Sequence, residues 1–230
     1  MGSVTRDGLQ TADVDAVSFD LFGTLVTVDR PDDPAAAVGD ALRERGVPVP
    51  ADWPRRYRSS EAAASSGEAV SLYDHVAAAL EGAVDDSVDR SRVADAVDAA
   101  FDRDVDVRPE APAAVQRVAD HVPVGVLSNS AVPGLVERSM RRSALPGDAV
   151  DVVLASVDLG VRKPDRRAFE AVATRLGVEP GELTHVGDDP RTDGGVERVG
   201  GTFVHVESSL AVALATMEET ESAVELEGRR

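Results

Sequence analysis

The side chains of this chain that could do chemistry end or follow short apolar runs, as Asp20, Ser128, Asn129, Asp188 and Asp189 do, or precede a helical pattern, as Lys163 does. They offer a carboxylate that can serve as a nucleophile, a hydroxyl, an amide, an ammonium and a pair of acids. Two carboxylates from different loops form a typical site for a hard cation such as Mg²⁺, which keeps several waters besides. A nearby ammonium would offset the remaining negative charge.

Lys163 is distinctive because it is the single lysine among 24 basic residues. A lysine ammonium is a compact point charge on a flexible stem, whereas an arginine guanidinium is a planar fork. Lys163 therefore suits a place beside a carboxylate or phosphate that has no room for a fork. The alternative is a surface residue without a function.

The elements that must position these side chains follow from the apolar pattern. Short β-branched and aromatic runs predict buried strands at 14–22, 121–127, 150–155, 183–187 and 202–206. Helical patterns separate or precede them at 111–120, 133–142, 165–176 and after Asp193. Strands alternating with helices indicate an α/β fold with a parallel sheet. Ligands of such sheets bind beyond the carboxyl ends of the strands, so the polar side chains are expected to converge on one crevice.

The segment 33–103 has a different pattern. It shows no convincing strand and has alanine-rich helical stretches at 34–45, 68–81 and 87–101. A helical block between the first strand and the other four indicates an insertion. Beyond residue 206 we expect one short helix and an acidic tail over 207–230.

Composition excludes several classes of protein. The formal charge of -18 repels nucleic acid and anionic membranes, so neither is expected as a partner. The absence of cysteine excludes disulfides, thiolate zinc sites and a cysteine nucleophile. No run approaches the roughly 18 apolar residues of a membrane span, and no signal peptide is visible, so a cytoplasmic protein is expected. The preference for arginine and aspartate is typical of an extreme halophile and indicates a haloarchaeal origin.

Four segments resemble, in chain order, the motifs of the haloacid dehalogenase-like (HAD) hydrolase superfamily: FDLFGTL at 19–25, VLSNS at 126–130, RKPD at 162–165 and HVGDDPRTD at 185–193. The helical block lies where that superfamily inserts a small helical cap. The resemblance implies a Rossmann-like three-layer core at 13–30 and 105–215, a cap at 31–104 and an acidic C-terminal tail at 216–230. It also implies a covalent aspartyl-enzyme intermediate and a small-molecule substrate.

Residue by residue, the resemblance implies this catalytic set: Asp20, Thr24, Ser128, Asn129 and Lys163. Asp20 would be the nucleophile, Ser128 would hydrogen-bond a phosphoryl oxygen, and Lys163 would hold both Asp20 and the transferring group. Mg²⁺ would be bound by Asp20, Asp188 and the backbone carbonyl of Phe22. Asp193 or Asp189 would support it from outside the coordination shell.

Some of these residues also have a local interpretation. Thr24 can simply satisfy its turn, and Asp165 is expected to cap the helix that follows it rather than to act in catalysis. His185, in or near a strand, is expected to be structural.

Position 22 departs from the phosphatase pattern. Phosphatases of this superfamily usually have a second aspartate there, which protonates the leaving group, and Phe22 cannot transfer a proton. Dehalogenases lack that acid because a halide needs no proton, but they work without metal, which leaves the acidic pair Asp188 and Asp189 unexplained. Unpaired buried carboxylates are costly, so we give the acidic pair more weight.

The sequence therefore favours a Mg²⁺-dependent HAD-type phosphohydrolase, slow or selective for activated phosphates such as acyl or aryl phosphates. The alternatives are a metal-independent 2-haloacid dehalogenase and a HAD-like binding module that has lost turnover. No recognisable pattern specifies the substrate or the oligomeric state. Arg55, Arg56 and Arg58, beside Trp53 and Tyr57, either bind a substrate anion or form an ordinary solvated helix face.

Overall fold

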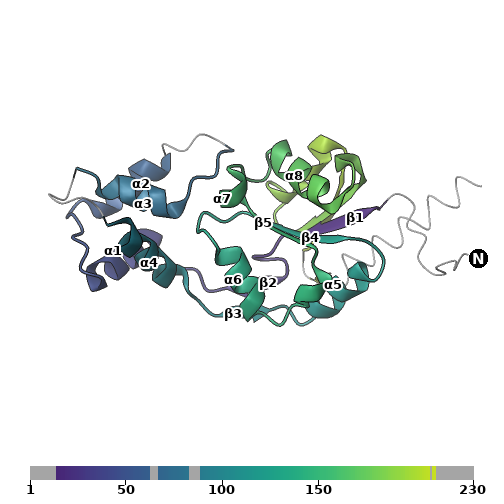
Figure 1. Cartoon of the computed structure of the whole chain (residues 1–230), viewed down its shortest axis with the longest axis horizontal. Coiled ribbons are helices and arrows are strands. Elements are labelled where there is room, and N and C mark those ends of the chain that lie inside the picture. The colour runs from purple at the N-terminus through teal and green to yellow at the C-terminus, as the bar shows by residue number, and fades with distance from the viewer. Residues whose placement is uncertain (1–13, 63–66, 83–88, 208, 211–230) are drawn as a thin grey trace, which may run out of the picture.

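The computed structural model of the chain describes residues 14–62, 67–82, 89–207 and 209–210. They form an α/β core and a block of helices, which lie along the long axis of the molecule (Figure 1). The short helix and acidic tail expected over 207–230 fall almost wholly outside the described residues. Among the helices that are described, none combines the length and apolar character needed to cross a membrane.

The core is built on a five-stranded sheet whose central strand is β1 (Ala16–Phe19). The other strands are β4 (Val124–Ser128), β5 (Val152–Ala155), β6 (Leu183–Gly187) and β7 (Thr202–His205). Their order is β5-β4-β1-β6-β7, and every pairing in it is parallel. Each strand falls on one of the five predicted runs, so the predicted α/β fold with a parallel sheet is confirmed.

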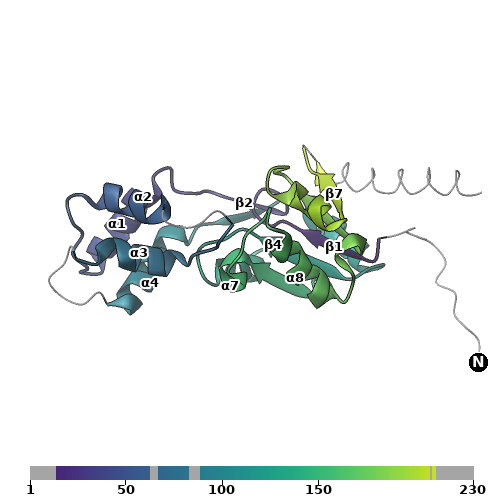
Figure 2. The same ribbon diagram turned by 90° about the horizontal axis from the view of Figure 1, so that it is seen from above.

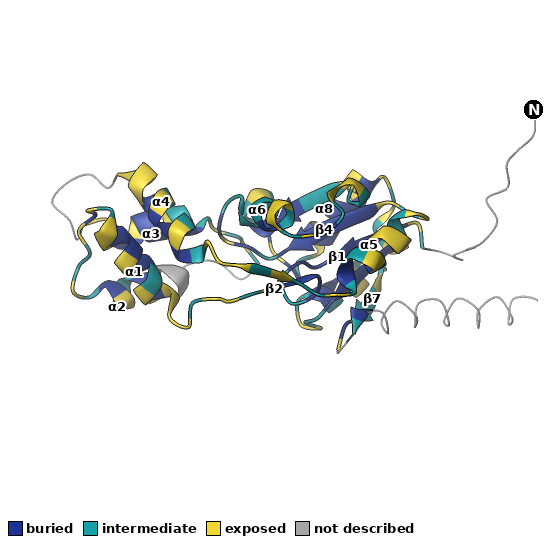
Figure 3. Ribbon diagram, turned by 90° about the horizontal axis from the view of Figure 1, so that it is seen from below, coloured by how far each residue is buried: buried dark blue, intermediate teal, exposed yellow. Residues whose placement is uncertain are grey.

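Helices cover both faces of this sheet. On one face, α5 (Ala111–Ala119) and α6 (Leu135–Arg142) join a buried cluster with Val126, and on the other face α8 (Arg166–Leu176) joins a cluster with Leu127. Val126 and Leu127 face opposite ways because side chains alternate along a strand. Figure 3 shows β1 and β4 in the buried centre of the core. The helices predicted at 111–120, 133–142 and 165–176 are confirmed.

Short helical segments complete the core: α7 (Ser156–Leu159) and the 3-10 helices Gly147–Ala149, Pro180–Glu182 and Asp193–Val199. The last of these is the short helical pattern predicted after Asp193. Asp165 is the N-cap of α8, where its carboxylate accepts a hydrogen bond from the backbone N–H of Arg167 at 2.9 Å. The expected capping role of Asp165 is thus confirmed.

The block consists of α1 (Pro34–Glu44), α2 (Trp53–Ala62), α3 (Leu72–Leu80) and α4 (Arg90–Phe101). These helices enclose a hydrophobic cluster to which the core contributes Val132 and which is distinct from the two clusters of the sheet. Trp53 is buried in it, and its indole N–H donates to the backbone oxygen of Ala35 at 2.7 Å. The alanine-rich stretches predicted α1, α3 and α4 but not α2. The sequence of α2 has few apolar residues, and arginines and Pro54 interrupt their helical spacing.

Two chain crossings join the helical block to the core, and they run side by side as an antiparallel ribbon (Figure 2). The ribbon pairs β2 (Val26–Val28) with β3 (Val105–Val107). Arg108 adds a side-chain hydrogen bond of 2.6 Å to the backbone oxygen of Gly23. The ribbon was not predicted from the sequence, because strands of three residues are too short to show an alternation of apolar and polar side chains.

Candidate active site

The carboxyl ends of the three central strands open into one cavity. Because β1 lies between β4 and β6, Asp20 after β1 has Ser128 on one side and Asp188 on the other. The cavity has a volume of about 240 Å³ and is lined by Asp20, Phe22, Arg30, Ser128, Asn129, Lys163, Asp188, Asp189, Thr192 and Asp193. The structure thus brings together the side chains that the sequence predicted to converge.

Lys163 lies at the centre of the cluster. Its Nζ is 2.8 Å from Oδ1 of Asp20 and 2.7 Å from Oδ1 of Asp193, and its side chain is only 1% exposed. A buried ammonium that bridges two carboxylates fits the expectation that Lys163 is a compact charge where a guanidinium fork has no room. The reading of Lys163 as a free surface residue is wrong.

Asn129 holds the backbone of Lys163 rather than reaching into the cavity with free polar atoms. Its Oδ1 accepts from the backbone N–H of Lys163 at 2.9 Å, and its Nδ2 donates to the backbone oxygen of the same residue at 3.0 Å. Both ends of the amide are therefore engaged by the backbone of one residue. The loop after β4 fixes the loop that carries Lys163.

Ser128 differs from Asn129 because its hydroxyl is free. The residue is 1% exposed, and its Oγ has no hydrogen-bond partner among the described residues although it is buried. A buried polar atom without a partner is costly, and such atoms are rare in native proteins. Ser128 lines the cavity, so an oxygen of a bound ligand can satisfy it.

His185 and Ser18 form a polar layer beneath Lys163. They are direct partners in the pairing of β1 with β6, and Ser18 Oγ lies 2.8 Å from Nδ1 of His185. Nε2 of His185 lies 3.3 Å from Oδ1 of Asp193 and 3.4 Å from Nζ of Lys163. Burial and the charge of Lys163 lower the pKa of His185 to about 4, so the ring is neutral at pH 7. His185 supports the cluster from below, in line with the structural role expected of it.

Three carboxylates of the site lie close enough to share a cation. One oxygen from each of Asp20, Asp188 and Asp193 lies within 4.8 Å of the others. Both oxygens of Asp193 are already in use, because Oδ1 faces Lys163 and Oδ2 accepts from the backbone N–H of Asp189 at 3.0 Å. Oδ2 of Asp20 and Oδ2 of Asp188 have no hydrogen-bond partner among the described residues.

The charges of the cluster do not balance, since Lys163 alone faces three carboxylates. Burial raises the pKa of Asp20; the Lys163 ammonium opposes this, and the charge of Asp193 adds to it. Burial also acts to raise the pKa of Asp193, but the bonds from His185 and Lys163 outweigh it and hold that pKa well below its usual range. Like charges at this distance favour a bound cation.

Two glycines make room for these carboxylates. Gly23 has a φ of +104°, and a Cβ placed on it would lie 2.5 Å from Oδ2 of Asp188. A Cβ on Gly187 would overlap the carboxylate of Asp193. Thr24 fixes the other oxygen of Asp188 by donating to Oδ1 at 3.0 Å. The hydroxyl of Thr24 thus positions an acid of the site.

Asp189 and Phe22 occupy less central positions. The carboxylate of Asp189 accepts from the guanidinium of Arg191 at 3.1 Å, so of the two candidates for a supporting acid only Asp193 lies in the cluster. The ring of Phe22 lines the cavity, and the guanidinium carbon of Arg30 lies 5.8 Å from its centroid. The site contains no carboxylate at position 22, as the sequence requires.

Sequence reasoning missed Ser18 and Arg30. Ser18 is a polar residue inside a fully buried strand, opposite a histidine in another one, and this pairing becomes visible only when the strand register is known. Arg30 gave no signal in the sequence. Of the arginines near Trp53, Arg55 and Arg56 pair with Asp52 and line none of the cavities described here. These contacts fit the solvated helix face, on which Arg58 is likewise exposed.

Solved structures with a similar fold include a dehalogenase and a phosphatase. The 2-haloacid dehalogenase from Pseudomonas syringae pv. Tomato DC3000 is 26% identical, with a TM-score of 0.63 over 84% of this chain and 86% of that one. A HAD phosphatase from Thermococcus onnurineus is 23% identical, with a TM-score of 0.53 over 84% and 86% of the two chains.

A sequence relative, phosphatase MT3486 of Mycobacterium tuberculosis (strain CDC 1551 / Oshkosh), is 50% identical over 56 residues, which are 24% of this chain and a quarter (25%) of that protein. Similarity thus extends to phosphatases and to dehalogenases alike. Residues 14–195 match the haloacid dehalogenase-like hydrolase family as a whole. The chain belongs to the haloacid dehalogenase-like hydrolases.

Proposed function

We propose that the protein is a Mg²⁺-dependent phosphohydrolase that works through an aspartyl phosphate on Asp20. The observation that carries the proposal is the position of Asp188. Its carboxylate lies within 4.8 Å of the carboxylates of Asp20 and Asp193, and Lys163 supplies the only ammonium of the cluster. A divalent cation would balance the charge that remains.

The residues present fit Mg²⁺. Asp20 and Asp188 each have an oxygen available, and hard carboxylate oxygens are the ligands that Mg²⁺ prefers. The backbone carbonyl of Phe22 would add a third protein ligand, and Asp193 would orient Lys163 and the loop at Asp189 from outside the coordination shell. Bound Mg²⁺ would polarise a phosphoryl oxygen and lower the repulsion between the phosphate and the site.

The chain's own residues would divide the reaction as follows. Asp20 attacks the phosphorus atom, a bond forms to its carboxylate oxygen, and the bond to the leaving oxygen breaks. Lys163 neutralises charge on the transferring group, and the unpartnered Ser128 hydroxyl donates to one of its oxygens. Water then hydrolyses the aspartyl phosphate, which releases phosphate and restores Asp20.

The leaving oxygen must take its proton from water, because Phe22 has none to give. Positioned acid catalysis contributes typically about 10²–10⁴-fold, so its absence favours substrates whose leaving groups are stable as anions. We therefore propose aryl or acyl phosphates rather than alkyl phosphates. The helical block would act as the cap that closes over such a small-molecule substrate.

A 2-haloacid dehalogenase is the second candidate. Phe22 favours it, as does the 26% identity to a 2-haloacid dehalogenase, and a halide would leave without a proton. Against it stands the cluster of acids, since Asp188 and Asp193 without a cation would repel the carboxylate of a haloacid. A module that binds Mg²⁺ or a ligand without turnover is the third candidate.

One set of assays separates the three candidates. Release of phosphate from 4-nitrophenyl phosphate that needs Mg²⁺ and is lost in Asp20→Asn supports the phosphohydrolase. Asp188→Asn should lose the response to Mg²⁺, whereas Asp189→Asn is the matched control, because that carboxylate faces Arg191. Release of chloride from 2-chloropropionate in EDTA supports the dehalogenase. Mg²⁺ binding by calorimetry with neither activity supports the binding module.

A further inference from the structure

A second cavity adjoins the candidate active site, between the core and the helical block. It has a volume of about 380 Å³ and shares Phe22, Arg30 and Asn129 with the cavity that holds Asp20. Its far wall comes from the helical block and the chain crossings, through residues such as Tyr57 and Phe101. A group attached to a phosphate at Asp20 would therefore extend past Phe22 into this space.

The walls of the second cavity are largely apolar. Aromatic and aliphatic side chains come from both sides, among them Phe22, Tyr57, Leu72, Phe101 and Leu135. A ligand of drug size is usually held by such a surface, with a few polar groups that fix its orientation. The body of the bound group is therefore expected to be apolar.

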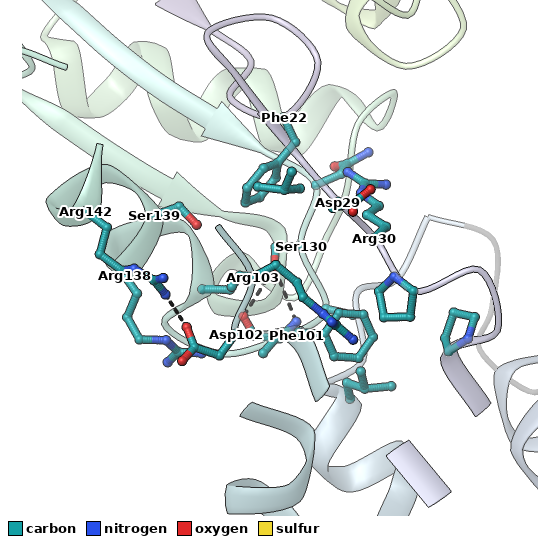
Figure 4. Close-up of a pocket in the computed structure, with 18 of the residues that line it drawn as sticks. Phe22, Asp29, Arg30, Phe101, Asp102, Arg103, Ser130, Arg138, Ser139 and Arg142 are labelled. Carbon is teal, nitrogen blue, oxygen red and sulfur yellow. Dashed lines mark hydrogen bonds and ion pairs between the residues drawn. The ribbon is translucent and has the colours of Figure 1, made fainter. Parts of the chain in front are cut away.

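The charged residues that line this cavity have a positive net charge, whereas the protein as a whole is negative. Four arginines and two aspartates line it, although the chain has a formal charge of -18. Arg30 and Phe22 lie on one side of the cavity and Arg138 and Arg142 on the other (Figure 4). Arginines thus outnumber acids in the lining of a cavity that adjoins a site for a negative substrate.

Two of the four arginines serve the structure. Arg138 of α6 pairs with Asp98 of the helical block at 2.8 Å, and Arg142 pairs with Asp102. Both pairs join the core to the block, so these guanidinium groups are engaged.

Arg30 and Arg103 have no such partner. Neither forms an ion pair with any residue in the described part of the chain; Arg103 donates only Nε to the backbone oxygen of Ala100, at 3.3 Å. They stand at the two ends of the helical block, where the chain enters and leaves it. A guanidinium fork matches a carboxylate or a phosphate with two parallel hydrogen bonds.

We propose that this cavity binds the leaving group of the substrate, and that this group has an apolar body and a second anionic group held by Arg30 and Arg103. The proposal rests on the proposed phosphohydrolase function and specifies its substrate class: a phosphate ester with an apolar, acidic leaving group. Arg103 selects the substrate without touching the reacting atoms. Arg30 lines both cavities and lies nearer to the phosphate.

The test compares two substrates that differ in charge alone: 4-(carboxymethyl)phenyl phosphate and 4-(carbamoylmethyl)phenyl phosphate. We expect kcat/KM to be about fivefold to tenfold higher for the acid than for the amide, as two partly solvated arginine contacts allow. Arg103→Met should lower kcat/KM for the acid more than for the amide and so reduce the preference to what Arg30 alone provides. Arg55→Met is the matched control, because Arg55 pairs with Asp52 outside the cavity, and it should keep the preference.

Binding of the free leaving groups separates the two proposals. Calorimetry with 4-hydroxyphenylacetate and 4-hydroxyphenylacetamide should show tighter binding of the acid by the wild type and a smaller difference between the two for Arg103→Met. If both phosphates are hydrolysed at equal kcat/KM, the anion site is refuted and the phosphohydrolase stands. If neither is hydrolysed but the acid binds tighter in an Arg103-dependent way, the anion site stands and the phosphohydrolase is refuted. Equal binding of the acid and the amide by the wild type overturns the anion site in either case.

Discussion

Replacing Lys163 by methionine tests whether the single lysine holds the carboxylate cluster together. Methionine keeps an unbranched stem of similar length but removes the ammonium, which lies 2.8 Å from Asp20 and 2.7 Å from Asp193. The side chain of Lys163 is 1% exposed, so water cannot take the place of the lost charge. Two acids would be left in a buried place without their counter-ion.

The expected loss of stability follows from this burial. Removal of one partner from a buried ion pair costs about 3–5 kcal/mol, because it leaves a buried charge uncompensated. The lower end applies here, since Asp193 keeps its bond to the backbone of Asp189 and the side chain of Asp20 is 10% exposed. We expect a loss of about 3 kcal/mol. For a chain of this length that corresponds to a decrease in Tm of roughly 6–12 °C.

The assay is urea unfolding in EDTA of four proteins: the wild type, Lys163→Met, Asp193→Asn and the double variant. Lys163 and Asp193 are in contact, so the double variant should lose less stability than the sum of the two single losses, by about 1–3 kcal/mol. Added Mg²⁺ should stabilise Lys163→Met, because a cation would again offset the acids. Arg191→Met, which removes an exposed ion pair of the same loop, should unfold like the wild type.

Two results would refute this reasoning. A loss below about 1 kcal/mol for Lys163→Met would mean that the cluster does not depend on the ammonium, since surface ion pairs contribute no more than that. Strictly additive losses in the cycle would mean that Lys163 and Asp193 do not interact in solution.

The remaining predictions concern the metal, the leaving group and the solvent. Gly23→Ala should raise the Mg²⁺ concentration for half-maximal phosphatase activity about tenfold or more, because a Cβ would lie 2.5 Å from Oδ2 of Asp188; an unchanged Mg²⁺ titration would contradict this. Phe22→Asp should raise kcat/KM for an alkyl phosphate about 10²-fold relative to 4-nitrophenyl phosphate, because it supplies the missing acid; equal changes for both substrates would speak against it. The urea midpoint of the wild type should rise from about 0.2 M to about 2 M KCl, since the Debye length falls to about 3 Å at 1 M; a constant midpoint would exclude the halophilic reading of the charge of -18.

The sheet could be predicted from the sequence because each strand is a short apolar run bounded by polar or turn-forming residues. The run 183–187, for example, is followed at once by Asp188, and its strand is observed at Leu183–Gly187. The helix α2 and the ribbon of β2 with β3 could not be predicted in this way. Both owe their structure to partners distant in the chain, such as Ala35 for Trp53, and not to a local period.

For the candidate site, the positions of the residues could be predicted from the sequence, but their contacts could not. The positions of Asp20, Ser128 and Asp188 follow from their places at strand ends, because parallel strands present those ends together. What each side chain touches does not follow. No sequence pattern indicates that the amide of Asn129 binds the backbone of Lys163, or that the hydroxyl of Ser128 has no hydrogen-bond partner among the described residues. Those contacts depend on atomic positions fixed by the whole fold.

The central place of β1 in the sheet has a consequence for how the chain acquires its structure during synthesis. The strand that carries the nucleophile is made first, yet Ser18 finds its partner His185 at a separation of 167 residues. The helical block, whose buried cluster comes from its own four helices and adjoining turns apart from Val132, can collapse while later segments are still being made. A nascent chain that ends before β6 would therefore carry a finished block beside a strand with one edge unpaired. Such an edge is where aggregation begins, so the last third of the chain protects the first strand.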